Sequence, residues 1–225
     1  RDSISLSGVN SINWGRIMSQ VVYYFSSALS LGAPDRAISF TVPTGNFGDI
    51  FAGYVAKKMG LPIERLIIAT NDNDILSRTL QTGAYEMRGV EQTTSPSMDI
   101  QISSNFERLL FEAHDCDAAA VRGLMDGLKQ SGGFTISEKP LAAIRSEFSA
   151  GRSSVEETAQ PIQSVLETVG YLLDPHSAIP VKVARQNGPE AAPTVVLATA
   201  HSAKFPDPVN AASCLSPALP AWRPA

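Results

Sequence analysis

The chain has 225 residues, of which 44% are hydrophobic and 18% charged, and this is the usual composition of a globular protein. Its net charge of −4 arises from acidic and basic residues mixed along the sequence, so no basic stripe points to nucleic acid. No apolar run reaches the length of about 18 residues that a membrane-spanning helix needs, and the two separate cysteines, Cys116 and Cys214, indicate a reducing, cytoplasmic compartment rather than a secreted disulfide scaffold.

The first 70 residues predict a helix followed by a strand–helix–strand unit. Apolar residues over Ser11–Leu31 recur at steps of three and four, as in an amphipathic helix. Arg36–Val42 is a short β-rich run, Pro43–Asp49 ("PTGNFGD") is a turn, the next helical pattern ends near Gly60, and Glu64–Thr70 is a second buried strand. Two strands joined by a helix within about 35 residues are typical of a parallel βαβ unit. We therefore expect an α/β fold with a mostly parallel sheet flanked by helices.

The remainder of the chain alternates helical patterns with further strands. "NDNDILSRTL" opens a helix for which Asp72 or Asn73 is the expected cap, and Thr93–Asn105 is a polar loop. Helical patterns follow at Phe106–Ala113, Ala118–Gln130, Leu141–Phe148, Val155–Tyr171 and, interrupted by Pro180, in "DPHSAIPVKVARQNG", with strands in "GFTIS" and at Thr194–Ala200. We expect one α/β domain over residues 1–205, with a helical region at about 83–170, and a weakly structured tail over 206–225.

The turn at Pro43–Asp49 lies where open α/β sheets bind anionic ligands, between the carboxyl end of a strand and the start of a helix. Free N–H groups and the helix dipole favour a negative group there. Gly45 and Gly48 let the backbone approach it closely, and Thr44 and Asn46 add side-chain donors. The spacing matches neither common nucleotide-binding motif, so it favours a phosphate site and a plain glycine turn about equally.

Polar side chains also follow the last predicted strand, in "ATAHSAKF". Thr199, His201 and Ser202 are expected at the same edge of the sheet as the glycine turn. Such residues at a strand end are more often structural than functional. Lys204 invites interpretation as a Schiff-base lysine, but an exposed lysine is the stronger interpretation.

The segment "NSINWGR" opens the first helix. Asn10 or Ser11 is its expected cap. Arg16 opposes the helix dipole at this end, which indicates that it faces an anion.

Two acidic clusters resemble metal sites only superficially. "NDND", at Asn71–Asp74, lacks the glycine and the final glutamate of a calcium loop. "HDCD", at His114–Asp117, has no second ligand cluster, so we expect a helix cap at Asp115 or Asp117 there. "DPHSA" is most simply a turn and a helix start. The sequence therefore predicts no metal site.

Five segments in one order resemble the C-terminal part of bacterial threonine synthases, which depend on pyridoxal 5′-phosphate (PLP): "NSINWGR", "VPTGNFGDIFAGYVAKKMGLP", "ATNDND", "DPHSA" and "ATAHSAKF". The resemblance covers about residues 8–210 and is loosest from about 83 to 170. It implies the tryptophan-synthase-β-like fold of PLP fold type II, with the cofactor between α/β domains. It also implies the conversion of O-phospho-L-homoserine and water to L-threonine and phosphate.

The same resemblance implies roles for individual residues. The loop that holds the cofactor phosphate would be formed by Thr44, Gly45, Asn46, Phe47 and Gly48. Thr199 would place its hydroxyl against the pyridine nitrogen. The stretch that resembles the edge of the substrate and cofactor site contains Asn10, Ser11, Asn13 and Arg16.

The family's Schiff-base lysine lies in a motif N-terminal to all five segments, and none of the six lysines here stands in such a context. We therefore expect a C-terminal piece of a threonine synthase, inactive by itself, whose unpaired strand edges promote association. Two alternatives stay open. One is a related fold type II enzyme, such as a threonine dehydratase or a cysteine synthase. The other is a non-catalytic module that binds a phosphate-bearing ligand or a protein partner at the glycine turn.

Overall fold

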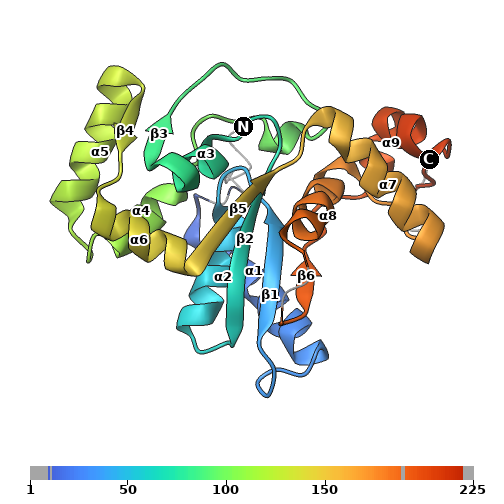
Figure 1. Cartoon of the computed structure of the whole chain (residues 1–225), viewed down its shortest axis with the longest axis horizontal. Coiled ribbons are helices and arrows are strands. Elements are labelled where there is room, and N and C mark those ends of the chain that lie inside the picture. The colour runs from blue at the N-terminus through green and yellow to red at the C-terminus, as the bar shows by residue number, and fades with distance from the viewer. Residues whose placement is uncertain (1–9, 11, 189–190, 220–225) are drawn as a thin grey trace, which may run out of the picture.

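A four-stranded sheet, parallel throughout, forms the centre of the molecule, in the strand order β5-β2-β1-β6 (Figure 1). The computed structural model describes residues 10, 12–188 and 191–219. The strands of this sheet are β1 (Ile38–Pro43), β2 (Ile63–Thr70), β5 (Phe148–Arg152) and β6 (Thr194–Val196). The predicted βαβ unit is confirmed, because α2 (Gly48–Lys58) connects β1 to β2 and the two strands pair in parallel.

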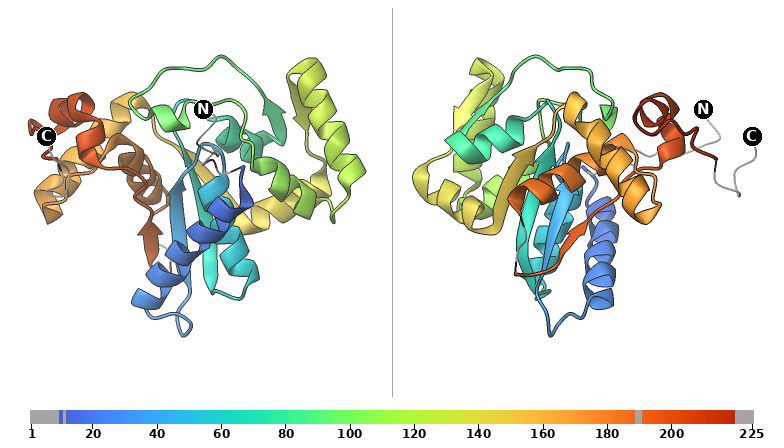
Figure 2. Two further views of the ribbon diagram at one scale, coloured as in Figure 1. Left: turned by 180° about the vertical axis from the view of Figure 1, so that it is seen from behind. Right: turned by 45° about the vertical axis from the view of Figure 1, so that its right-hand side comes forward.

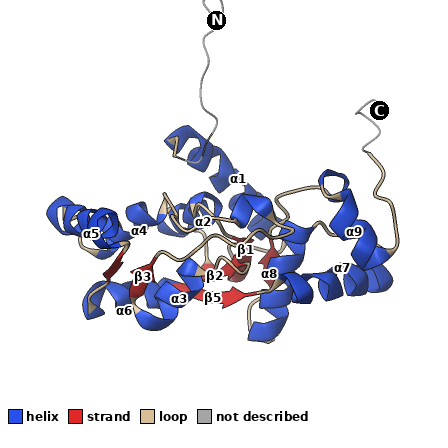
Figure 3. Ribbon diagram, turned by 90° about the horizontal axis from the view of Figure 1, so that it is seen from above, coloured by secondary structure: helices blue, strands red, loops and turns tan. Residues whose placement is uncertain are grey.

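Helices cover both faces of the sheet (Figure 3). On one face lie α2 and, packed upon it, α1 (Trp14–Ser30); on the other lies α8 (Pro175–Asn187). Strand β2 shows why two layers are needed. Leu66 and Ile68 belong to the core cluster under α2, whereas Ile67 and Ala69 pack with residues of α8. A strand buried on both faces carries a continuous apolar run, as the sequence predicted for this segment.

Two groups of elements flank the sheet (Figures 1 and 2). Beyond β5 lies a lobe composed of α3 (Ile75–Thr82), β3 (Ala84–Glu86), α4 (Phe106–Ala113), α5 (Ala118–Ser131), β4 (Gly133–Thr135) and α6 (Glu138–Glu147). In this lobe β3 and β4 form a small antiparallel sheet. On the other side, α7 (Val155–Val169) and α9 (Pro206–Ser213) pack together beside α8. Two short 3₁₀ helices complete the fold, η1 (Pro96–Met98) and η2 (Ser202–Lys204).

Strand β5 differs from the prediction. The sequence pattern predicts a helix that ends at Phe148, within a helical region over about 83–170, but Phe148–Arg152 is a strand of the main sheet. The segment is short and contains small residues, so its own propensity is weak. Pairing with β2 and packing under α8 decide its conformation, and a Cβ on Gly151 would lie 2.6 Å from Val183.

Two further predictions near the C-terminus differ from the structure. The segment 206–225 was expected to be weakly structured, but Pro206–Ser213 is helix α9, with Val209 fully buried. Residues 214–219 form no helix or strand, and residues 220–225 lie outside the described residues. Pro180 was expected to interrupt a helix, yet α8 continues through it. Burial explains both, because contacts with the rest of the fold outweigh a weak local preference. The strand expected at Thr194–Ala200 is also shorter, since β6 ends at Val196.

The approach of α1 to α2 depends on Gly53. A Cβ on this residue would lie 2.5 Å from the ring of Tyr24 and 2.9 Å from Leu66. The ring of Tyr24 therefore occupies the space where a side chain of α2 would otherwise lie, and its centroid is 4.8 Å from that of Phe40 on β1. Through this contact the side of α1 is fixed against the start of α2.

Substitution of Gly53 tests this close packing. We expect Gly53→Ala to lower the free energy of unfolding by about 1–3 kcal/mol, because overpacking a filled core forces neighbouring side chains to move. Gly123→Ala is the matched control, since nothing lies within 4 Å of a Cβ added there in helix α5. It should stabilise by about 0.5–1 kcal/mol through helix propensity. Urea denaturation measures both, and equal shifts of the same sign would contradict the interpretation.

Candidate functional site

The predicted phosphate loop connects β1 to α2 at the carboxyl end of the sheet. The backbone of Phe47 is left-handed, with φ of 64°, and its side chain is buried against Phe106 and Phe148. Among the described residues, the N–H groups of Gly45, Asn46, Phe47 and Gly48 donate no hydrogen bond. These N–H groups precede a helix whose dipole favours an anion. The loop therefore has the donors that an anion site needs.

The sequence suggested Thr44 as a side-chain donor to an anion, but its donors already have partners within the protein. It is buried, and its hydroxyl donates to the carbonyl oxygen of Val42 at 2.7 Å, while its N–H donates to that of Ala69 at 2.8 Å. Its donors are thus used within the sheet edge.

A cleft of about 750 Å³ lies beside this loop, between the start of α1, the start of α2 and the segment after β6. It brings together four of the predicted site residues, which are Asn10, Asn13, Arg16 and Thr199. Asp49, the residue that directly follows the phosphate loop, also lines it, whereas Thr44–Gly48 do not. Ser11, the remaining predicted residue, lies outside the described residues. Residues about 180 positions apart in the sequence, at the start of α1 and after β6, thus line one cleft.

The start of α1 is capped by Asn13, not by Asn10 or Ser11 as predicted. The side chain of Asn13 accepts a hydrogen bond from the N–H of Gly15 at 2.9 Å. The cap moves inward because Asn10 closes a turn of its own, in which its carbonyl oxygen accepts from the N–H of Asn13 at 2.9 Å. This turn is fastened to α4, since Arg108 donates to the carbonyl oxygen of Ile12 at 3.0 Å. Both asparagines are therefore held at the cleft.

Asp49 is the acidic group of the cleft, and the sequence analysis did not identify it. The hydroxyl of Tyr24 donates to the carbonyl oxygen of Asp49 at 2.8 Å and approaches its carboxylate at 3.4 Å. Burial raises the pKa of Asp49 to about 6, against the opposing effects of the Tyr24 hydrogen bond and the positive charge of Arg16. Arg16 lines the same cleft as Asp49, and its positive charge lowers the pKa of that carboxyl. Acidic residues near a helix start are common, so the sequence alone gave no signal for this role.

The segment after β6 contributes one of its predicted polar residues to the cleft. Thr199 is exposed and lines it. His201 instead caps η2, because its Nδ1 accepts from the N–H of Ala203 at 3.1 Å, and Ser202 is buried. His201 and Ser202 thus have structural roles, which are the commoner roles of polar residues at a strand end.

None of the six lysines lines the cleft. Lys57 pairs with Glu147 at 2.6 Å, and Lys58 lies over the ring of Tyr54, both at the end of α2 that is remote from the phosphate loop. Lys204 is exposed, with its Nζ 5.7 Å from the centre of the Phe205 ring.

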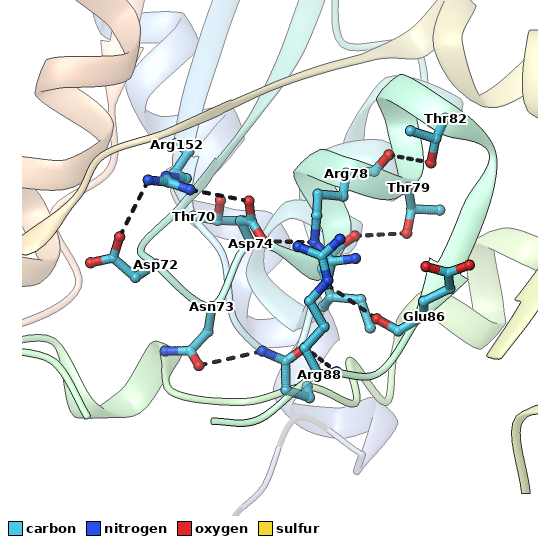
Figure 4. Close-up of polar contacts among 12 residues, drawn as sticks. Thr70, Asp72, Asn73, Asp74, Arg78, Thr79, Thr82, Glu86, Arg88 and Arg152 are labelled. Atoms are coloured by element: carbon cyan, nitrogen blue, oxygen red, sulfur yellow. Dashed lines mark hydrogen bonds and ion pairs between the residues drawn. The ribbon is translucent and has the colours of Figure 1, made fainter. Parts of the chain in front are cut away.

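The "NDND" segment forms a charged turn at the carboxyl ends of β2 and β5 (Figure 4). Arg152 lies between Asp72 and Asp74, 3.6 Å from each carboxylate, and Arg78 pairs with Asp74 at 2.8 Å. Asp74 is the N-cap residue of α3, not Asp72 or Asn73 as predicted. Asn73 is unavailable because its amide donates to the carbonyl oxygen of Glu91 and to Asp99.

The described part of the chain contains no group of three or more His, Cys, Asp or Glu side chains that could hold a metal ion. In the "HDCD" segment, Asp117 caps α5 by accepting from the N–H groups of Ala119 and Ala120, which confirms the expected cap. No helix of the described residues is both long and apolar enough to cross a bilayer.

A second hollow, of about 1090 Å³, lies between the start of α1, α4 and α5. Its lining is mostly apolar, and none of the residues predicted for the site lines it. The smaller cleft is the candidate site because it joins predicted residues of two segments, the start of α1 and Thr199, with Asp49 directly after the phosphate loop.

Comparison with known proteins gives one family. The family model described as "Threonine synthase, C-terminal" matches residues 177–223. Threonine synthase of Pseudomonas aeruginosa is 50% identical over 218 residues, which are 96% of this chain and 46% of that protein. Threonine synthase of Saccharomyces cerevisiae is 43% identical over 226 residues, 92% of this chain and 44% of that protein. The chain thus spans about half the length of the curated relatives it matches.

Solved structures agree with this result. The crystal structure of PLP-bound threonine synthase from Brucella melitensis has a TM-score of 0.94 and 82% identity, and the match covers 98% of this chain and 48% of that one. Threonine synthase from yeast has a TM-score of 0.85 and 43% identity, over 91% of this chain and 44% of that one. The α/β fold predicted from the sequence is therefore confirmed as that of these enzymes.

The raised pKa of Asp49 predicts a pH dependence of stability. Because the pKa in the folded protein, about 6, lies above the unfolded value of 3.8, the folded state binds this proton more tightly. The resulting stabilisation is fully present below pH 3.8 and is lost as the pH rises through about 6. Asp49→Asn, which cannot ionise, should therefore stabilise the protein at pH 8 by about 1–2 kcal/mol, a part of the roughly 3 kcal/mol that a shift of about two pKa units represents.

Urea denaturation at pH 4 and pH 8 measures this effect. Asp126→Asn serves as the control, because Asp126 is an exposed residue of α5. A similar effect of Asp49→Asn at both pH values would show that its carboxyl does not titrate as described.

Proposed function

Because the chain belongs to the threonine synthase family and spans about half the length of its curated members, we propose that it forms the C-terminal part of a threonine synthase. The whole enzyme would convert O-phospho-L-homoserine and water to L-threonine and phosphate with pyridoxal phosphate as its cofactor. The observation that carries this proposal is the cleft at the carboxyl edge of the sheet. There the start of α1, the residue after the phosphate loop and Thr199 come together.

The phosphate loop fits the phosphate group of the cofactor. Four successive N–H groups, from Gly45 to Gly48, donate to nothing among the described residues, and they stand at the start of α2. Hydrogen bonds to a charged group contribute roughly 1.5–3 kcal/mol each, so several of them suffice to anchor a phosphate. When bound, pyridoxal phosphate supplies an electron sink for carbanions. The loop would hold and orient it.

Thr199 would place its hydroxyl at the ring nitrogen of the cofactor. Its position supports this role, because it is exposed at the cleft and lies in the segment that follows β6, the strand next to β1. A hydroxyl does not force full protonation of the ring nitrogen as a carboxylate would, so the electron sink would be milder. We expect this property to suit an elimination followed by addition of water.

Arg16, Asn10, Asn13 and Ser11 would form the substrate edge. Arg16 supplies a positive charge to the cleft, and the two asparagines are fixed beside it by the turn at the start of α1. A guanidinium recognises phosphate and carboxylate oxygens through paired N–H donors. These are the anionic groups of O-phospho-L-homoserine.

The Schiff-base lysine would come from polypeptide outside this chain. None of its six lysines lines the cleft. The chain alone would therefore hold half of the site and be inactive. We place the enzyme in the cytoplasm, because both cysteines are exposed and unpaired, as in a reducing compartment.

The function is tested by turnover in the full-length protein that carries this chain. Arg16→Ala should raise KM for O-phospho-L-homoserine by about 10- to 100-fold, because a charged hydrogen bond contributes roughly 1.5–3 kcal/mol. Arg122→Ala, which alters an exposed arginine of α5, is the control and should change nothing.

Phosphate release and threonine formation measure this reaction. Deamination of L-threonine or cysteine formation, without turnover of O-phospho-L-homoserine, would favour a related fold type II enzyme. Binding of phosphate without any turnover would favour a non-catalytic module.

Self-association of this chain remains a prediction. The outer edges of β5 and β6 have no strand neighbour among the described residues, and unpaired edges invite further pairing. Analytical ultracentrifugation should show a sedimentation coefficient that rises with concentration. A single monomeric species at every concentration would contradict it.

A further inference from the structure

The polar segment 93–105, which we call the strap, runs across the phosphate loop. The hydroxyl of Ser103 donates to the carbonyl oxygen of Gly45 at 2.7 Å. The backbone N–H and the side-chain amide of Asn105 both donate to the carbonyl oxygen of Asn46, at 3.1 Å and 3.0 Å. Two successive carbonyl groups of the loop are therefore tied to the strap.

These bonds decide where the N–H groups of the loop point. In a trans peptide the C=O of one residue and the N–H of the next lie on opposite sides of the bond, and no peptide bond of this loop is cis. Fixing the Gly45 carbonyl on the strap thus directs the N–H of Asn46 away from the strap. Fixing the Asn46 carbonyl does the same for the N–H of Phe47.

The strap also packs directly against the backbone of the loop. A Cβ on Gly45 would lie 2.9 Å from the carbonyl oxygen of Ser97 and 3.3 Å from the Cα of Met98. Because Gly45 has no side chain, the strap can lie this close to the backbone of the loop. This contact and the hydrogen bonds act on the same side of the loop.

The strap is itself held rigidly from three directions. The N–H of Ser103 donates to the hydroxyl of Tyr85 at 2.8 Å, and the Tyr85 ring is stacked on Phe106 and Phe134. Asp99 accepts from Asn71 at 2.7 Å.

At its other end the strap meets α8. The N–H of Ser97 donates to Nε2 of His176 at 3.3 Å, and that imidazole is buried. These contacts fix the position of the strap, and the strap in turn fixes the position of the loop.

We propose that Ser103 and Asn105 are positioning residues of the phosphate subsite, which hold the carbonyl groups of Gly45 and Asn46 so that the following N–H groups face the bound phosphate. The proposal rests on the proposed function, because it deepens the role of the phosphate loop. Both side chains are buried and donate to carbonyl groups of the loop, so they would act through the loop backbone.

Ligand pairs that differ only in phosphate test this role in the full-length protein. Ser103→Ala should weaken binding of pyridoxal phosphate by about five- to tenfold, since it removes one hydrogen bond that orients the loop. Binding of pyridoxal, which lacks the phosphate, should be unchanged. Ser103→Thr keeps the hydroxyl and should restore the affinity.

Ser104→Ala is the matched control. Ser104 is the half-buried neighbour, and its hydroxyl has no hydrogen-bond partner in the described part of the chain. It should leave the ratio of the two affinities unchanged. Asn105→Asp, which removes the side-chain donor at constant size, provides a second variant if Ser103→Ala fails to fold, and it should weaken pyridoxal phosphate selectively.

The outcomes distinguish a failure of the proposed phosphate site from a failure of the proposed role of the strap. If the unaltered protein binds pyridoxal phosphate no more tightly than pyridoxal, the proposed phosphate site is wrong. If the unaltered protein discriminates and the variants at Ser103 and Asn105 discriminate equally well, the strap has no positioning role. If these variants weaken both ligands equally, the role is merely structural, and the inference is overturned.

Discussion

The polar backbone groups at the end of β1 impose the constraint on which the rest of this structure depends. Strand β1 is buried along its whole length, and it must turn into α2 at a place where neither a sheet neighbour nor a helix turn can pair every N–H and C=O group. Buried backbone groups without partners are costly. Here the strap pairs with the carbonyl groups of Gly45 and Asn46, and the N–H groups remain available for an anion. Pairing of the loop carbonyl groups with the strap thus leaves a row of N–H donors that have no partner among the described residues.

The cleft beside the phosphate loop depends on a different interaction, the contact of Tyr24 with Gly53. It brings α1 so close to α2 that the Tyr24 hydroxyl reaches the backbone of Asp49. The start of α1 is then fixed by Arg108, so that Asn13 and Arg16 face the cleft. An arginine and a half-buried carboxyl at one edge give the cleft a charge that changes with pH. The wall of the cleft that carries Asn13 and Arg16 is therefore built by helix packing rather than by a loop.

Much of the fold could be predicted because its signals are local. The continuous apolar runs of β1 and β2, with a glycine turn and one amphipathic helix between them, predict a parallel pair. Strand β5 could not be predicted, since its conformation comes from pairing with β2 and from α8 above Gly151. Helix α9 was missed for the same reason, as Val209 finds its burial only against other elements. The caps at Asn13 and Asp74 differ from expectation because the neighbouring asparagines have other partners. Asn10 closes a turn of its own, and the side chain of Asn73 donates to Glu91 and Asp99.

Some residues of the candidate site could likewise be predicted from the sequence, and others could not. The glycine turn, Arg16 and Thr199 could be named as candidates from the sequence, because glycine turns, helix starts and strand ends of a parallel sheet fall at known places. Their roles stay predictions. Asp49 and the strap could not be named, since their roles arise from contacts across 25 to 60 residues of chain. The sequence by itself determined the layered α/β plan, the family and the candidate ligand-binding segments, because these follow from short-range patterns. Only the tertiary structure decided which way the phosphate loop points and what charge faces it, because both depend on side chains that approach from remote parts of the chain.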